Sequence, residues 1–182
     1  QGVFCQKPSP TQPSFSIRQA IRQKGGRSIF LLYDLALGEV MTPMYRLLVD
    51  LALKEALSTE ANGHTHLFLD ELKLLPKVTH LEDALNFGRS KRVSVVAGLQ
   101  SVGQIYATYG QEAGQVILGG FGSVIALNTG DYASRDYVTR LFGPNVTAYR
   151  YENGSHTPID RERDGFSVEH WHIQQLPPGH AV

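Results

Sequence analysis

The sequence predicts an α/β fold in which a largely parallel sheet is flanked by helices and followed by a carboxyl-terminal β-hairpin. Short apolar stretches alternate along the chain with amphipathic stretches of helical spacing, as in successive βα units. The apolar stretch 29–32 is uninterrupted, which is typical of a strand buried on both faces of a parallel sheet. The final stretch instead alternates with a period of two, which predicts an antiparallel hairpin.

The amino-terminal part is predicted to hold an extended lead-in, a helix and a strand. Residues 1–14 contain three prolines and no apolar periodicity, so they form the lead-in. Residues 15–23 have amphipathic spacing and precede Gly25 and Gly26, which end the helix. The uninterrupted apolar run 29–32 predicts a buried strand.

A longer helix is predicted next, and the βα pattern follows it. Thr42 can cap this helix and Pro43 suits its first turn, so we expect a helix from there to Leu57. Its charges are spaced by four and predict one exposed stripe, made of Arg46, Asp50 and Lys54. Further strands are predicted at 66–72, 92–99 and 123–130, helices at 80–88, 101–110, 112–118 and 133–143, and hairpin strands at 145–154 and 165–173.

Composition limits the classes of function. The 182 residues are 42% hydrophobic, enough for one sizeable core. Lys plus Arg and Asp plus Glu both total 17, so no overall basic field indicates nucleic-acid binding, and any such partner must be held by local patches. Cys5 is the only cysteine, which excludes an internal disulfide framework. The chain starts without Met and stops where a strand could begin, so we expect a piece of a longer protein.

Two adjacent carboxylates, Asp70 and Glu71, follow the strand predicted at 66–72. Reactive groups gather at the carboxyl ends of strands in open α/β sheets. There, one carboxylate can orient the water shell of Mg²⁺ while the other polarises an attacking water, as phosphoryl transfer requires. A polar strand end that caps the next element is the alternative interpretation of this pair.

Arg89 and Gln100 strengthen the first interpretation. Arg89 follows the next predicted helix and Gln100 follows the next predicted strand, and we expect both at the sheet edge that Asp70 occupies. An arginine can neutralise charge on a γ-phosphate, and a glutamine can position water. Taken singly, Arg89 is better explained as a surface arginine and Gln100 as a helix cap, so the first interpretation depends on their joint placement.

The phosphate-binding loop that should accompany these residues is missing. A P-loop requires G-x-x-x-x-G-K-[ST], but none of the six lysines precedes Ser or Thr. By itself the chain should therefore bind nucleotide poorly. A direct metal cluster is not expected either, because the pairs His64/His66 and His170/His172 offer too few ligands for zinc and the cysteine is remote.

The stretches 68–110 and 123–143 together resemble the TraD/TraG family of type IV coupling proteins, the membrane-anchored hexameric ATPases of bacterial conjugation. The resemblance depends on an ordered set of motifs: an acidic strand end, "GR", a strand followed by "LQS", and a strand followed by "TGD". It implies that residues 15–182 are the carboxyl-terminal portion of a RecA-like P-loop NTPase motor domain whose Walker A loop lies upstream. It also implies that Asp70 and Glu71 are the Walker B pair, with Asp70 holding Mg²⁺ through water.

The same resemblance implies roles and partners. Arg89 would be the arginine finger that reaches the neighbouring subunit's nucleotide, and Gln100 the glutamine sensor. ATP and Mg²⁺ would bind only with the missing Walker A portion. The intact protein would be a homo-hexamer at the cytoplasmic face of the bacterial inner membrane, moving single-stranded DNA and relaxase toward the channel components of a type IV secretion system. The alternatives are another DNA-pumping ATPase of the FtsK or HerA kind, a coupling protein for protein substrates only, and a non-catalytic docking module.

Overall fold

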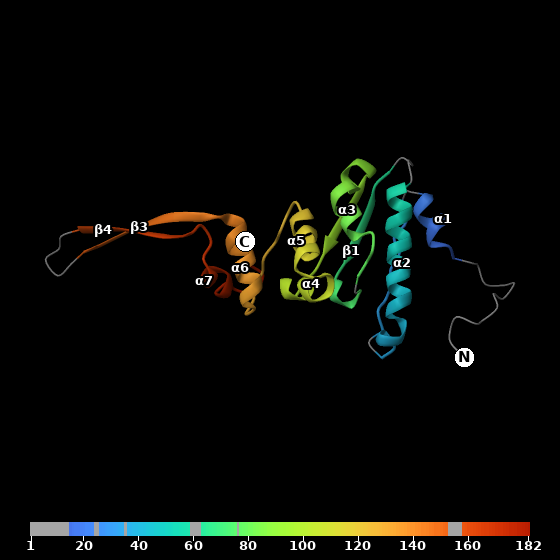
Figure 1. Cartoon of the computed structure of the whole chain (residues 1–182), viewed down its shortest axis with the longest axis horizontal. Helices are drawn as coiled ribbons and strands as arrows, with labels where there is room; N and C mark the ends of the chain where they lie inside the picture. The colour runs from blue at the N-terminus through green and yellow to red at the C-terminus, as the bar shows by residue number, and fades with distance from the viewer. Residues whose placement is uncertain (1–14, 24–25, 35, 59–62, 76, 153–157) are drawn as a thin grey trace. The chain divides into compact units, whose positions relative to one another are not determined.

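The computed structural model describes residues 15–23, 26–34, 36–58, 63–75, 77–152 and 158–182 (Figure 1). The lead-in predicted at 1–14 and the helix-ending Gly25 lie outside these residues. The chain forms two compact units, residues 1–98 and 99–182, and each is described by itself.

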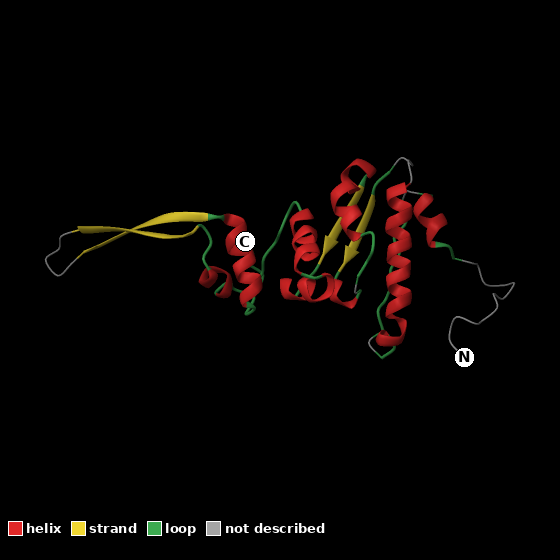
Figure 2. Cartoon of the chain, viewed as in Figure 1, coloured by secondary structure: helices red, strands yellow, loops and turns green. Residues whose placement is uncertain are grey.

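The first unit is built around a parallel βαβ arrangement. In chain order it contains α1 (Ile17–Arg22), α2 (Gly38–Ser58), β1 (Thr65–Leu69), the 3-10 helix η2 (Leu72–Leu74), α3 (Leu81–Phe87), the 3-10 helix η3 (Gly88–Lys91) and β2 (Val93–Ala97). The strands pair in parallel, from Thr65 opposite Val93 to Leu69 opposite Ala97, and their arrows point the same way in Figure 2. The strands predicted at 66–72 and 92–99 and the helix predicted at 80–88 are confirmed, with shorter bounds.

Helix α2 supplies much of the core of the first unit. Its Leu53 is fully buried, as are Leu72 of η2, Leu81 of α3 and Val78, which lies between η2 and α3. Burying side chains of this kind contributes about 1.5–3 kcal/mol each, so α2 and α3 are held to the unit mainly by their apolar faces.

An ionic contact joins α1 to α2. Glu55 is only 4% exposed, and its carboxylate lies 2.7 Å from Arg18 Nε and 2.8 Å from Arg22 Nε. The hydrogen bond from Arg22 is the largest influence that holds the pKa of Glu55 below its usual range. A buried carboxylate without these partners would carry a desolvation penalty, so α1 and Glu55 depend on one another.

Two predictions in the first unit are wrong. The run 29–32 is not a strand: Phe30 and Leu32 are each 82% exposed, and no strand of the described part pairs with this segment. An apolar run becomes a strand only where its backbone groups find a partner. The second helix begins at Gly38, before Thr42, so Pro43 lies inside it rather than in its first turn, and the Thr42 hydroxyl donates to the Gly38 carbonyl oxygen at 2.7 Å.

The second unit contains four helices and a hairpin within the described residues. They are α4 (Val102–Tyr109), α5 (Gln111–Gly120), α6 (Tyr132–Phe142), β3 (Pro144–Glu152), β4 (Pro158–Phe166) and α7 (His170–Gln174). The predicted helices at 101–110, 112–118 and 133–143 are confirmed. Ala126, Val138 and Ile173 form a buried cluster, in which Ile173 brings α7 against the rest of the unit.

The predicted hairpin is confirmed, but the predicted position of its second strand is wrong. β4 pairs antiparallel with β3, from Pro144 opposite Phe166 to Glu152 opposite Pro158, so it overlaps the predicted second strand, 165–173, only at its first two residues. The alternating segment 165–173 instead enters α7, because Glu169 and His172 form a reciprocal capping box that starts a helix.

The strand predicted at 123–130 is also not a regular strand. Within this segment, Ala126 exchanges two backbone hydrogen bonds with Val182, at 2.8 and 3.0 Å. Its neighbours Ile125 and Leu127 are 78% and 60% exposed. The segment is therefore extended and only locally paired.

Candidate functional site

The two predicted carboxylates lie at the carboxyl end of β1. Asp70 is exposed and directly follows the last residue of the strand, and Glu71 is the half-buried residue that precedes η2. The Glu71 Oε1 atom is buried and has no hydrogen-bond partner. A buried carboxylate oxygen without a donor is costly, so this atom is ready to accept a hydrogen bond from a group that enters the site.

Gly98 fixes the backbone conformation on either side of these carboxylates. Its N–H donates to the Leu69 carbonyl oxygen at 2.7 Å, and its own carbonyl accepts from the Leu72 N–H at 3.1 Å. A Cβ at position 98 would collide with the Asp70 carbonyl oxygen. Only glycine permits this close approach. Sequence reasoning missed Gly98, although a glycine directly after a parallel strand is a recognised signal of close backbone contact.

The structure does not place Arg89 beside the carboxylates. Arg89 is an exposed residue of η3, the element that leads into β2, and the Thr65 N–H at the start of β1 donates to the carbonyl of neighbouring Arg92 at 2.9 Å. The prediction that Arg89 shares an edge with Asp70 is therefore wrong: residues that precede a parallel strand lie at its amino end. The length of β1 separates the two edges by roughly 13 Å.

Gln100 is the second residue of the second unit, and the residues after it are held by a hydrogen-bond network. Gln100 is exposed, and the next residue, Ser101, is the N-cap of α4. The Ser101 hydroxyl donates to Asp131 Oδ2 at 2.8 Å. The same oxygen accepts the N–H of Ser134 at 2.8 Å and its hydroxyl at 2.6 Å. We call Ser101, Asp131 and Ser134 the Asp131 network.

The Asp131 network also holds the first turn of α4. The Ser134 hydroxyl oxygen accepts the Val102 N–H at 3.0 Å, and the Ser101 hydroxyl oxygen accepts the Gly103 N–H at 3.1 Å. The hydrogen bond from the Ser134 side chain is the main reason that the pKa of Asp131 lies below its usual range. Sequence reasoning noted "TGD" but missed this network, although an acidic N-cap followed three residues later by Ser is a helix-start signal.

The match to a known family decides the class of protein. A family model described as the type IV secretion-system coupling protein DNA-binding domain matches residues 4–176. The chain belongs to this family.

Solved structures of coupling proteins are similar to this coupling-protein domain. The bacterial conjugative coupling protein TrwBdeltaN70, in an unbound monoclinic form, is 27% identical with a TM-score of 0.79, over 92% of this chain and 40% of that chain. The plasmid coupling protein TrwB in complex with ADP and Mg²⁺ is 27% identical with a TM-score of 0.75, over 92% and 39%. The same values hold for TrwB with the non-hydrolysable ATP analogue ADPNP. No curated protein sequence matches.

These matches support the predicted partial RecA-like α/β fold. The domain spans about two fifths of the length of the TrwB structures. None of its described helices is both long and apolar enough to cross a bilayer.

The two histidine pairs lie in different local structures. His64 and His66 stack with their ring centroids 5.9 Å apart, and His170 and His172 lie in α7 rather than in a strand. No group of three His, Cys, Asp or Glu side chains that could hold a metal ion occurs among the residues described. His172 has a structural partner, since its Nδ1 accepts the Glu169 N–H at 3.0 Å.

Proposed function

We propose that this chain is the carboxyl-terminal part of the ATP-hydrolysing motor domain of a conjugative coupling protein. The intact protein would use ATP to move single-stranded DNA, with or without its relaxase, toward a type IV secretion channel. The observation that carries the proposal is the unpartnered, buried carboxylate oxygen of Glu71, next to exposed Asp70 at the carboxyl end of a parallel strand. Membership of the coupling-protein family supports it.

The chemistry assigned to the two carboxylates follows from their exposure. Bound MgATP would supply the phosphoryl group and the metal charge that the reaction requires. Asp70, which faces solvent, can orient the metal's water ligands. Glu71, which is half-buried with a free acceptor oxygen, can take a proton from the attacking water. Gly98 keeps the two carboxylates in place because it fixes the backbone of Asp70.

One face of the β1–β2 sheet supports the view that the chain works inside a larger domain. Phe68 on β1 and Val96 on β2 are 72% and 54% exposed, and both belong to the same side of the described sheet. Parallel sheets are normally covered on both faces. We propose that the rest of the motor domain, including its Walker A loop, covers this face, and that the isolated chain is inactive.

Assembly and location are part of the same proposal. We place the intact protein at the cytoplasmic face of the bacterial inner membrane as a homo-hexamer. Relaxosome proteins and channel components would be its protein partners. Arg89, exposed at the amino end of β2, would act on the nucleotide of a neighbouring subunit, and Gln100 would serve as the sensor beside the site.

The deciding experiment replaces Glu71 in the intact protein. Glu71→Gln keeps the size of the side chain but removes its basicity, so DNA-stimulated ATP hydrolysis should fall by about 100-fold or more. ATP binding, measured by equilibrium titration, should stay within about threefold. Glu82→Gln on α3 is the matched control, because Glu82 is an exposed glutamate in the same unit, and it should leave the rate unchanged.

Two results would contradict the proposal. If Glu71→Gln hydrolyses ATP at the wild-type rate, Glu71 is not the base. If the unmodified intact protein neither binds nor hydrolyses ATP, the chain is a docking module that keeps the fold without the chemistry.

A further inference from the structure

We propose that Asp131 is a positioning residue that holds Gln100 in place for ATP hydrolysis. This inference rests on the proposed function, because it assigns a task to a residue that does not itself touch the nucleotide. Its basis is the Asp131 network, which joins the start of α6 to the residue that follows Gln100.

The direction of each hydrogen bond in the network is set by Asp131. A serine hydroxyl has a single hydrogen to donate. Ser101 and Ser134 both donate theirs to Asp131 Oδ2, at 2.8 and 2.6 Å. Their oxygens are then free to accept the backbone N–H groups of Gly103 and Val102, at 3.1 and 3.0 Å. Removing the carboxylate charge would weaken both of these hydrogen bonds, so the two hydroxyls would be oriented less firmly as acceptors for the first turn of α4.

Burial of Ser134 and the charge of Asp131 strengthen the hydrogen bonds of the Asp131 network. Ser134 is only 8% exposed, and its bond to the Val102 N–H is buried. The three hydrogen bonds that Asp131 accepts are partly buried, and charge-assisted hydrogen bonds are stronger than neutral ones. Gln100 is therefore attached to a helix start that is fixed from α6, while its own side chain remains exposed. A sensor needs this combination of a fixed backbone and an accessible side chain.

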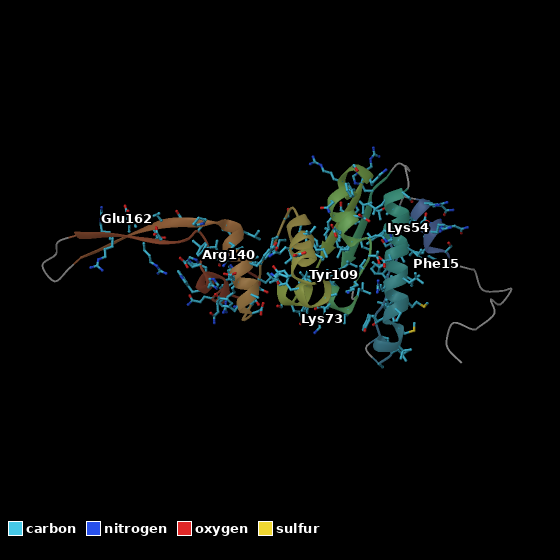
Figure 3. The ribbon with its side chains drawn as sticks, in the orientation of Figure 1. Phe15, Lys54, Lys73, Tyr109, Arg140 and Glu162 are labelled. Carbon is cyan, nitrogen blue, oxygen red and sulfur yellow. The ribbon has the colours of Figure 1, made fainter. Side chains whose placement is uncertain are left out.

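The first test replaces Asp131 in the intact protein. Asp131→Asn keeps an oxygen at the centre of the network but removes its charge. The kcat for DNA-stimulated ATP hydrolysis should fall about tenfold or more, with KM for ATP within about twofold, because a misplaced group near the chemistry slows the reaction without removing binding contacts. Asp136→Asn on the same helix is the control. Asp136 pairs at 2.8 Å with Arg140, an exposed side chain labelled in Figure 3, and kcat should not change.

A double-mutant cycle separates positioning from simple helix capping. If Asp131 acts through Gln100, Asp131→Asn should cost little further kcat in a protein that already carries Gln100→Ala. If the network only caps α4 and α6, the two losses in log kcat should add. Additive losses, or a wild-type kcat for Asp131→Asn, would overturn the inference.

Position 101 keeps the inference testable if Asp131→Asn fails to fold. Ser101→Ala removes one donor, while Ser101→Thr restores the hydroxyl, so kcat should fall in the first and recover in the second. Equal kcat in both variants would overturn the inference. Glu71→Gln separates failure of this inference from failure of the proposed function. If Glu71→Gln loses ATP hydrolysis while Asp131→Asn and Ser101→Ala keep the wild-type kcat, only the positioning role of Asp131 is contradicted.

Discussion

Glu71 in the first unit and Asp131 in the second are acidic residues that precede a helix, yet their carboxylates are in opposite states. One Asp131 oxygen accepts three hydrogen bonds, from Ser101 and from the backbone and side chain of Ser134. Glu71 Oε1 is buried and accepts none from the part of the chain described. We call a charged group saturated when it is paired within the described structure, like Asp131, and open when it has no such partner, like Glu71 Oε1. A saturated carboxylate stabilises the local structure, whereas an open one is available to a ligand.

The same contrast extends to other charged groups. Glu55 is saturated, because Arg18 and Arg22 both contact it. Arg89 is exposed and takes part in none of the ion pairs found among the described residues. We therefore expect substitutions of the open groups, Glu71 and Arg89, to reduce activity with little change in stability. Substitutions of the saturated groups, Asp131 and Glu55, should change local stability first.

The largest effect is expected for Arg89. An arginine that acts on a neighbouring subunit's nucleotide is worth about 10³-fold or more in rate, so Arg89→Ala should nearly abolish DNA-stimulated ATP hydrolysis by the intact protein. Mixing Arg89→Ala subunits with wild-type subunits should depress activity more than simple dilution, because each variant subunit disables its neighbour.

Arg92→Ala is the control for Arg89, since Arg92 is also exposed and lies in the same basic stretch. A linear fall in activity with the fraction of Arg89→Ala subunits would show that Arg89 does not act in trans. Thermal unfolding should be the same for Arg89→Ala and wild type. A clearly lower unfolding temperature for Arg89→Ala would contradict the distinction between open and saturated groups.

The next effect is a loss of local stability at Asp131. Asp131→Ala removes the N-cap of α6 and leaves the Ser134 N–H without its acceptor, which should cost about 1–2 kcal/mol. Hydrogen exchange of the intact protein should show faster exchange at the amides of Val102, Gly103 and Ser134. Glu71→Ala should leave exchange in η2 unchanged, since Glu71 makes no side-chain cap there. Equal changes at both sites would contradict the comparison.

The fold was predictable where local pattern and pairing agree. Short, mainly apolar stretches identified β1 and β2, and helical spacing identified α3 to α6. The segments 29–32 and 123–130 each contain an uninterrupted run of four apolar residues, but they do not pair as regular strands in the described structure. Periodicity reports which side chains avoid water and carries no information on which strand supplies the hydrogen bonds.

The candidate site was predictable only in part. The position of Asp70 and Glu71 follows from a strand that ends in two acids. The predicted edge for Arg89 is wrong because Arg89 precedes β2, and residues that precede a parallel strand lie at the edge opposite to Asp70. The Asp131 network joins residues that are 30 apart in sequence, so it becomes visible only when α4 and α6 are placed together.

Acidification should affect the two saturated carboxylates in the same direction. The pKa of Asp131 lies below its usual range, chiefly because the Ser134 side chain donates to it. A folded-state pKa below the unfolded value of about 3.9 contributes stability that is fully present above that value and is lost as the pH falls through the folded pKa. Protection of the Val102 and Gly103 amides, corrected for intrinsic exchange, should therefore be constant from about pH 7 to 5 and decrease below about pH 4. Asp131→Asn should remove this decrease.

The smallest effect is expected at Glu55, where the consequence is confined to one short helix. Glu55→Gln removes the charge that Arg18 and Arg22 share, so α1 should separate more often from α2 while the apolar core around Leu53 remains. Limited trypsin digestion of the intact protein should then cleave faster after Arg18 and Arg22, because the two arginines are released from their common partner. Asp50→Asn, at an acidic residue of the same helix whose ion pairs are longer, is the control and should not change these two cleavages. Unchanged cleavage in Glu55→Gln would mean that apolar contacts, and not the saturated carboxylate, hold α1.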